Sequence, residues 1–229
     1  MGNRAGGLDL NWDIAIDALP TLISGIKWTI VIAVVGLIFG FLIGAVAGLA
    51  RTSKNKIIYA LGTIYVEAIR GTPILVQAVY LYFGINQILL QTVGIKIEPI
   101  PAGIIAISVN SGAYIAEIVR GAVQSIHKGQ IEAGRSLGLS HFKTFYYIVW
   151  PQAFRRMIPP LCNQFIISLK DTSLFSVIAV GELLRQGQIV VATTFAAFEI
   201  YTAVAVLYLV MTLSISALLR RVERRMDVG

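Results

Sequence analysis

Two helical faces of this chain carry polar side chains within otherwise apolar stretches. The members of each set are four and three residues apart, a spacing that places side chains on one face of a helix: Asn110, Tyr114 and Glu117 in the first set, and Gln164, Ser168 and Asp171 in the second. Two such faces opposite each other could line a water-filled path. They could equally form hydrogen bonds between helices without a cavity, and the spacing does not distinguish these alternatives.

Charged residues interrupt the same apolar stretches. Glu67 and Arg70 are three residues apart, as are Glu117 and Arg120, so each pair could meet on its own helix and neutralise itself. A lone charge at the centre of a membrane helix costs about 2.5–3.5 kcal/mol or more. These residues therefore need partners or a wet cavity.

The composition shows which elements must position these groups. Of the 229 residues, 56% are hydrophobic and 14% are charged, whereas soluble domains have roughly 45–50% and about 25%. This is typical of an integral membrane protein. The net charge of +7 arises from short basic clusters beside apolar runs, which favours orientation in the bilayer over nucleic-acid binding. The single Cys162 excludes an internal disulfide and is interpreted as a small apolar residue.

The apolar runs predict an all-α membrane domain with five spans. Their expected bounds are residues 28–50, 57–84, 101–123, 159–180 and 195–219. Residues 1–20 are expected to be an extracytoplasmic amphipathic segment that ends at Pro20. Residues 86–99 are expected to form an external loop, and residues 182–194 another external segment.

The basic residues predict the orientation of these spans. Thirteen of the 19 lysines and arginines fall in the connections around residues 51–56, 120–156 and 220–225. The positive-inside rule places these connections in the cytoplasm, so the N-terminus is outside and the C-terminus is inside. At about 1.5 Å rise per residue, Glu67, Lys170 and Asp171 are expected at one level near mid-bilayer.

Four glycines recur every fourth residue in the first predicted span: Gly36, Gly40, Gly44 and Gly48. They line one face of the helix and allow another helix to approach closely. A nucleotide-binding glycine loop would need a strand-to-helix turn and a lysine, which this stretch lacks.

The predicted cytoplasmic connection, residues 124–156, contains a short amphipathic helix. Its central residues are Glu132, Ala133, Gly134, Arg135, Ser136, Leu137 and Gly138. Gly138 is placed to end this helix and Ser140 to cap the next segment. The stretch resembles the "EAA" loop of the membrane subunits of ATP-binding-cassette (ABC) importers. It departs from that pattern at Gly134, where the pattern has alanine, and at Trp150, where it has leucine.

Five further stretches resemble the polar amino-acid permeases of ABC importers. They are residues 67–73 (EAIRGTP), 110–117 (NSGAYIAE), 120–123 (RGAV), 170–174 (KDTSL) and 181–183 (GEL). The resemblance implies a single type I permease domain over residues 1–229, in which residues 132–138 form a cytoplasmic coupling helix. It also implies a bacterial inner membrane, a second identical or related permease subunit, two ATPase subunits that bind ATP and Mg²⁺, and an extracytoplasmic amino-acid-binding protein. The chain itself needs no cofactor.

An amino-acid substrate gives the polar residues a role. Its ammonium group needs an acid and its carboxylate a basic or amide donor, so the predicted substrate-binding residues are Glu67, Asn110, Ser111, Tyr114, Gln164, Ser168, Lys170 and Asp171. A second free acid would favour a cationic substrate such as arginine. The same acids could instead be structural.

Two other function classes are weighed against a permease. An ion-coupled secondary transporter would explain intramembrane acids, but five spans without an obvious inverted repeat argue against it. A membrane enzyme would explain polar stripes, but the sequence has no nucleophile with a base and no metal-ligand cluster. The chain also carries no nucleotide-binding loop, so ATP hydrolysis is assigned to a separate chain.

Overall fold

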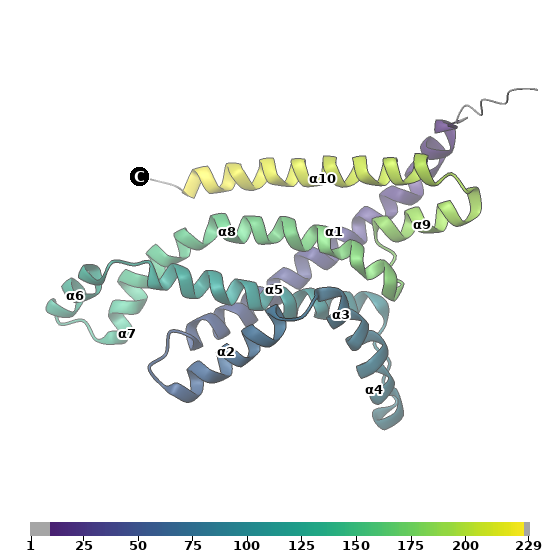
Figure 1. The fold of residues 1–229 in the computed structure, drawn as a ribbon. Coiled ribbons are helices and arrows are strands. Elements are labelled where there is room, and N and C mark those ends of the chain that lie inside the picture. Colours follow the sequence, from purple (N-terminus) through teal and green to yellow (C-terminus); the bar gives the residue numbers. More distant parts are fainter. Residues whose placement is uncertain (1–9, 227–229) are drawn as a thin grey trace, which may run out of the picture.

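The computed structural model describes residues 10–226, and the regular structure in this range is entirely helical (Figure 1). Four stretches are long and apolar enough to cross a membrane: Trp12–Ala50, Ile74–Val93, Pro99–Gln124 and Ala197–Arg221. Two further stretches, His141–Ile178 and Leu183–Thr194, meet at an angle of 44°. If this bent pair is counted as one crossing, there are five. The expected all-helical architecture is confirmed, with four or five apolar crossings.

Helix α1 (Trp12–Ala50) is one continuous helix of 39 residues. The prediction that an amphipathic segment ends at Pro20 is wrong, because Pro20 lies inside the helix; residues 1–9 of that predicted segment lie outside the described residues. Tertiary packing offsets the cost of the proline. Leu22 and its neighbours are buried against Leu183 and Ile200, which belong to the last two helices.

The glycine face of α1 packs against α5 (Pro99–Gln124), as predicted. A Cβ atom at Gly44 would lie 2.7 Å from the carbonyl oxygen of Gly112, and one at Gly48 would lie 2.6 Å from that of Ala116. The two backbones are therefore closer than any side chain on this face of α1 would allow.

The predicted second span, residues 57–84, is divided into two parts. Helix α2 (Lys56–Arg70) ends at Gly71, and α3 (Ile74–Val79) begins after Pro73, which has no N–H and holds the chain extended. A π-helical segment, Tyr80–Ile85, continues α3 into α4 (Asn86–Val93). The expected external loop is therefore helical over residues 86–93, and α4 bends away from the other helices (Figure 1).

The predicted cytoplasmic connection is also largely helical. It contains α6 (Lys128–Ser136), α7 (His141–Thr144) and a π-helical segment, Phe145–Val149, that leads directly into α8 (Trp150–Asp171). The fourth span was expected to open at Pro159 and Pro160, but both lie inside α8, which begins nine residues earlier than predicted.

The remaining chain returns along the outside of α8. A 3₁₀ helix, Thr172–Ile178, precedes α9 (Leu183–Thr194) and α10 (Ala197–Met226). The buried carboxylate of Glu182 accepts hydrogen bonds from the backbone N–H groups of Leu184 (2.9 Å) and Arg185 (2.7 Å), and from the hydroxyl of Tyr208 (2.7 Å). This one residue caps α9 and attaches it to α10.

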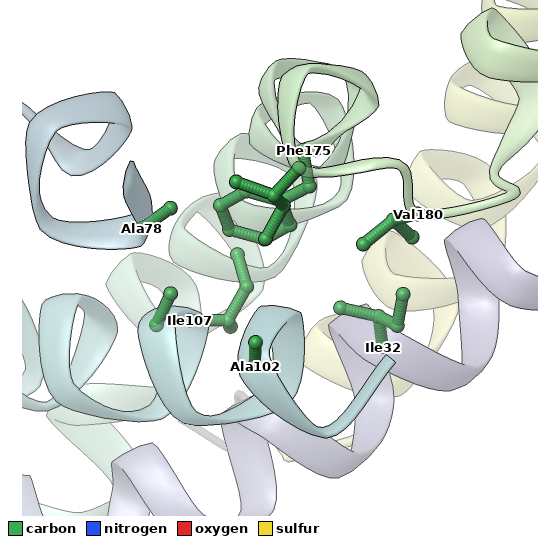
Figure 2. Packing of buried hydrophobic residues seen from close by; sticks show 8 residues of the cluster. Ile32, Ala78, Ala102, Ile107, Phe175 and Val180 are labelled. Carbon is green, nitrogen blue, oxygen red and sulfur yellow. The ribbon is translucent and has the colours of Figure 1, made fainter. Parts of the chain in front are cut away.

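A buried apolar cluster joins Ile32, in the middle of α1, to α3, α5 and the 3₁₀ helix (Figure 2). Phe175 lies at its centre and is fully buried between Ala78, Ile107 and Val180. The cluster holds α3 against α5 and against the 3₁₀ helix that follows α8. It therefore positions the polar residues around the break after α2.

Candidate functional site

A cavity of about 500 Å³ lies where the break after α2 meets α5 and α8. Its lining is mixed in character, with two charged groups, two amides, a phenol and backbone of the 71–73 turn. The lining residues are Arg70, Gly71, Thr72, Pro73, Ile74, Asn110, Tyr114, Gln164, Ile167 and Asp171.

Four of the eight predicted substrate-binding residues line this cavity: Asn110, Tyr114, Gln164 and Asp171. The first two come from α5 and the last two from α8. The two polar faces predicted from residue spacing therefore do meet at one cavity. Asn110 and Gln164 are buried, whereas Tyr114 is 39% exposed.

The other four predicted residues lie outside the cavity lining. Ser111 is buried in the contact between α5 and the glycine face of α1, next to Gly40. Ser168 is buried and its hydroxyl accepts a hydrogen bond from Gln164 Nε2 (3.3 Å), while Lys170 is exposed. Glu67 is 66% exposed and lies near Arg51, at the end of α1.

Of the two pairs that the spacing allows, Glu117 and Arg120 do meet, whereas Glu67 and Arg70 each have another partner. Arg120 Nη2 lies 2.6 Å from Glu117 Oε2, and Arg70 Nη1 lies 3.3 Å from Glu117 Oε1. Arg51 also pairs with Glu117, and its Nη2 lies 3.7 Å from Glu67 Oε1. We call these five residues the ion cluster. It joins the ends of α1 and α2 to α5, a grouping that helical spacing within one segment could not reveal.

Gln77 of α3 was not among the predicted site residues, yet its hydrogen bonds connect the break between α2 and α3 to α5. Its Nε2 donates to the backbone oxygens of Ile69 (2.8 Å) and Thr72 (3.0 Å), and its Oε1 accepts from Asn110 Nδ2 (3.0 Å). Arg70 was predicted only as a structural partner, but it also lines the cavity. The signal that points to Gln77 is Pro73, because a broken span leaves free backbone groups that polar side chains must satisfy.

The predicted coupling helix is present as α6. Gly138 ends it with a positive φ of 78°, and the Ser140 hydroxyl accepts from Lys143 N (3.3 Å), as predicted. Six of the seven predicted residues are exposed, all except Gly134: Glu132, Ala133, Arg135, Ser136, Leu137 and Gly138. Leu137 is 83% exposed, so an apolar side chain projects from the end of this helix.

The two departures from the "EAA" pattern have different environments. Gly134 faces inward, where a Cβ atom would collide with Ile148 Cδ1 and lie 3.2 Å from Thr144 Cγ2. Glycine at this position thus serves packing within the chain. Trp150 is partly buried and packs between Phe145 and Phe154, with ring centroids 6.0 and 6.3 Å away.

Comparison with known proteins identifies the family. A model of the family described as binding-protein-dependent transport system inner membrane component matches residues 36–228. The chain belongs to this family. The match runs from Gly36, the first glycine of the packing face of α1, through the end of α10, so it covers both the cavity and α6.

Individual relatives extend this result. The chain is 51% identical to the glutamine transport system permease protein GlnP of Escherichia coli K12, covering 96% of this chain and 100% of the relative. It is 39% identical to the L-cystine transport system permease protein TcyB of Bacillus subtilis, covering 96% and 93%. A crystal structure of an amino acid ABC transporter with histidines superposes with a TM-score of 0.87 at 38% identity, covering 95% of this chain and 100% of that chain. The resemblance to amino-acid permeases is confirmed.

Proposed function

We propose that this chain is the membrane-spanning permease subunit of an ATP-driven amino-acid importer, with a neutral polar amino acid such as glutamine as its substrate. One observation carries the proposal: the cavity holds one acid, Asp171, and one base, Arg70, together with the amides of Asn110 and Gln164. This set can bind the ammonium and carboxylate groups of an amino acid and a polar side chain.

The cavity favours a neutral side chain over a cationic one. Among its lining residues Asp171 is the one carboxylate, and it is needed for the substrate's ammonium group. The other candidate acid, Glu67, lies with Arg51 outside the lining. The expectation of arginine depended on a second free acid, so glutamine, named for the 51% identical relative, replaces it as the first candidate.

The topology that fits this function has five spans, with the N-terminus outside and the C-terminus in the cytoplasm. The bent pair of α8 and α9 counts as one span, and α6 then lies in the cytoplasm, where an ATPase subunit can dock on it. Two ATPase subunits, a second permease subunit and an extracytoplasmic binding protein complete the transporter. Labelling of single cysteines at Ser136 and Gln91 in a Cys162→Ser background tests the orientation: an impermeant thiol reagent added outside should modify the α4 position only.

Uptake by proteoliposomes tests the transport function. The chain reconstituted with its ATPase and binding protein should accumulate glutamine only when ATP is present, and arginine should compete weakly. Uptake by the chain alone, driven by an ion gradient, would establish the alternative, an ion-coupled secondary transporter. Asp171→Asn should raise the substrate concentration required for half-maximal uptake. An unchanged value would exclude Asp171 from the substrate site.

Paired leucine variants test the docking of α6. Leu137→Asp places a charge on the exposed end of α6 and should abolish co-purification of the ATPase. Leu90→Asp is the matched control, because Leu90 is also an exposed leucine (53%) but lies on α4. Equal ATPase recovery with both variants would contradict docking at this end of α6.

A further inference from the structure

Arg70 belongs both to the cavity and to the ion cluster. Its guanidinium carbon lies 5.4 Å from the ring centroid of Tyr114, and its Nη1 lies 3.3 Å from Glu117 Oε1. A guanidinium has five N–H donors in a planar fork, and one contact to Glu117 leaves most of them available. Stacking on Tyr114 orients the guanidinium within the cavity wall.

Glu117 does not depend on Arg70 for neutralisation. Its Oε2 accepts from Arg120 Nε (3.1 Å) and Nη2 (2.6 Å), and its Oε1 also accepts from Arg51. The ion cluster contains three guanidiniums and two carboxylates, so it has one positive charge in excess. That excess faces the cavity at Arg70, whose side chain is 40% exposed, against 33% for Arg120 and 8% for Arg51.

We infer that Arg70 binds the α-carboxylate of the transported amino acid by exchanging its contact with Glu117 for a two-point contact with the substrate. The inference rests on the proposed function and assigns the carboxylate subsite within it. Asp171 lines the same cavity from α8 and is the complementary partner for the ammonium group. A bidentate pair between a guanidinium and a carboxylate is stronger and more directional than a single contact.

The exchange also links the cavity to the packing of the helices. Arg70 ends α2, and its contact with Glu117 is one of the ties between α2 and α5. A carboxylate that captures Arg70 removes this tie, while Arg51 and Arg120 continue to hold Glu117. Binding of an amino acid in the cavity thereby breaks the contact between Arg70 and Glu117 in the ion cluster.

Competition between glutamine and glutaminamide tests the assignment, because the amide replaces the α-carboxylate with a neutral group. Direct binding is measured on the purified permease–ATPase complex without the binding protein, so that only the cavity discriminates. The wild-type complex should prefer glutamine by about 10- to 100-fold, the range expected for a hydrogen-bonded charge. Arg70→Gln should remove most of this preference, and Arg70→Lys should retain part of it. Arg185→Gln on α9, the same substitution outside the cavity lining, should leave the preference unchanged.

A second variant shifts affinity in the opposite direction. Glu117→Gln removes the internal competitor for Arg70, so glutamine should bind more tightly while the affinity for glutaminamide stays the same. A misfolded protein cannot produce this gain. An unchanged preference in Arg70→Gln, or weaker glutamine binding in Glu117→Gln, would overturn the role of Arg70 and leave the proposed function in place. Failure of the wild-type complex to bind glutamine would also overturn this inference, whereas failure of ATP-driven glutamine uptake in proteoliposomes would overturn the proposed function itself.

Discussion

Replacing Gly44 by alanine should weaken the contact between α1 and α5. The new Cβ would lie 2.7 Å from the carbonyl oxygen of Gly112 and 2.7 Å from Ile115 Cβ, whereas normal carbon contacts lie at roughly 3.5–4.0 Å. A carbonyl in a helix cannot rotate away, so the helices must separate by about 1 Å. Such a gap forfeits about a quarter to a half of the attraction of each affected contact.

The packing cost of Gly44→Ala can be measured by comparison with Gly121→Ala on α5. Both glycines lie inside helices, but a Cβ at Gly121 would meet nothing within 4 Å. Both variants gain about 1 kcal/mol of helix propensity, so the difference between them isolates the packing cost. Overpacking typically costs about 1–3 kcal/mol, and about 1 kcal/mol corresponds to roughly 2–4 °C in Tm for a chain of this size.

Thermal unfolding of the purified permease in detergent, followed by tryptophan fluorescence, measures this difference. Gly121→Ala should unfold at or above the wild-type temperature, and Gly44→Ala should unfold about 2–12 °C below Gly121→Ala. Equal melting temperatures for the two variants would refute the close approach of α1 and α5 at Gly44.

Three further predictions concern Gly134 in α6, the Glu182 cap of α9 and the break after α2. Gly134→Ala should change Tm little, because its Cβ meets Ile148 Cδ1, the far end of a flexible side chain that can turn away, while alanine gains about 1 kcal/mol of helix propensity; the same change in an Ile148→Val background, which removes that atom, should raise Tm, and equal effects in the two backgrounds would contradict the contact. Tyr208→Phe removes a 2.7 Å hydrogen bond to the buried Glu182 carboxylate and should destabilise the chain by about 1.5–3 kcal/mol, seen as a lower midpoint in denaturant unfolding. Gln77→Leu should accelerate amide hydrogen exchange in residues 69–77, since its bonds across the break are lost; exchange no faster than in wild type would show that the break holds without them.

Properties that depend on one helix face could be predicted from the sequence. The glycine spacing in α1, the end of α6 at Gly138 and the cap at Ser140 each require only neighbours within a few residues. The pairing of Glu117 with Arg120 has the same local character. In each case the periodicity of the helix determines which side chains lie together.

Properties that depend on contacts between distant segments were not predictable. Arg51 reaches Glu117 across 66 positions in the sequence, and no spacing rule selects that pair over the local one between Glu67 and Arg70. The prolines gave ambiguous signals for a related reason. Pro20 and Pro73 have the same effect on the backbone, yet α1 continues through the first because it is packed against α9 and α10, whereas α2 ends before the second.

Helix α6 and the cavity are connected through one continuous helical path. Arg156 of α8 donates to both the carbonyl and the hydroxyl of Ser125 (2.6 and 2.8 Å), so α8 is tied to the turn that precedes α6. Gly134 of α6 packs on Ile148, from which helical structure continues to Asp171 in the cavity wall. The helical rise from Ile148 to Asp171 is about 35 Å, at 1.5 Å per residue. A displacement of α6 therefore has a direct mechanical route to Asp171, and the opposite wall, which carries Arg70, is held separately by the ion cluster. We expect movement of α6 to change the distance between the two charged groups of the cavity, and with it the affinity for an amino acid that contacts both.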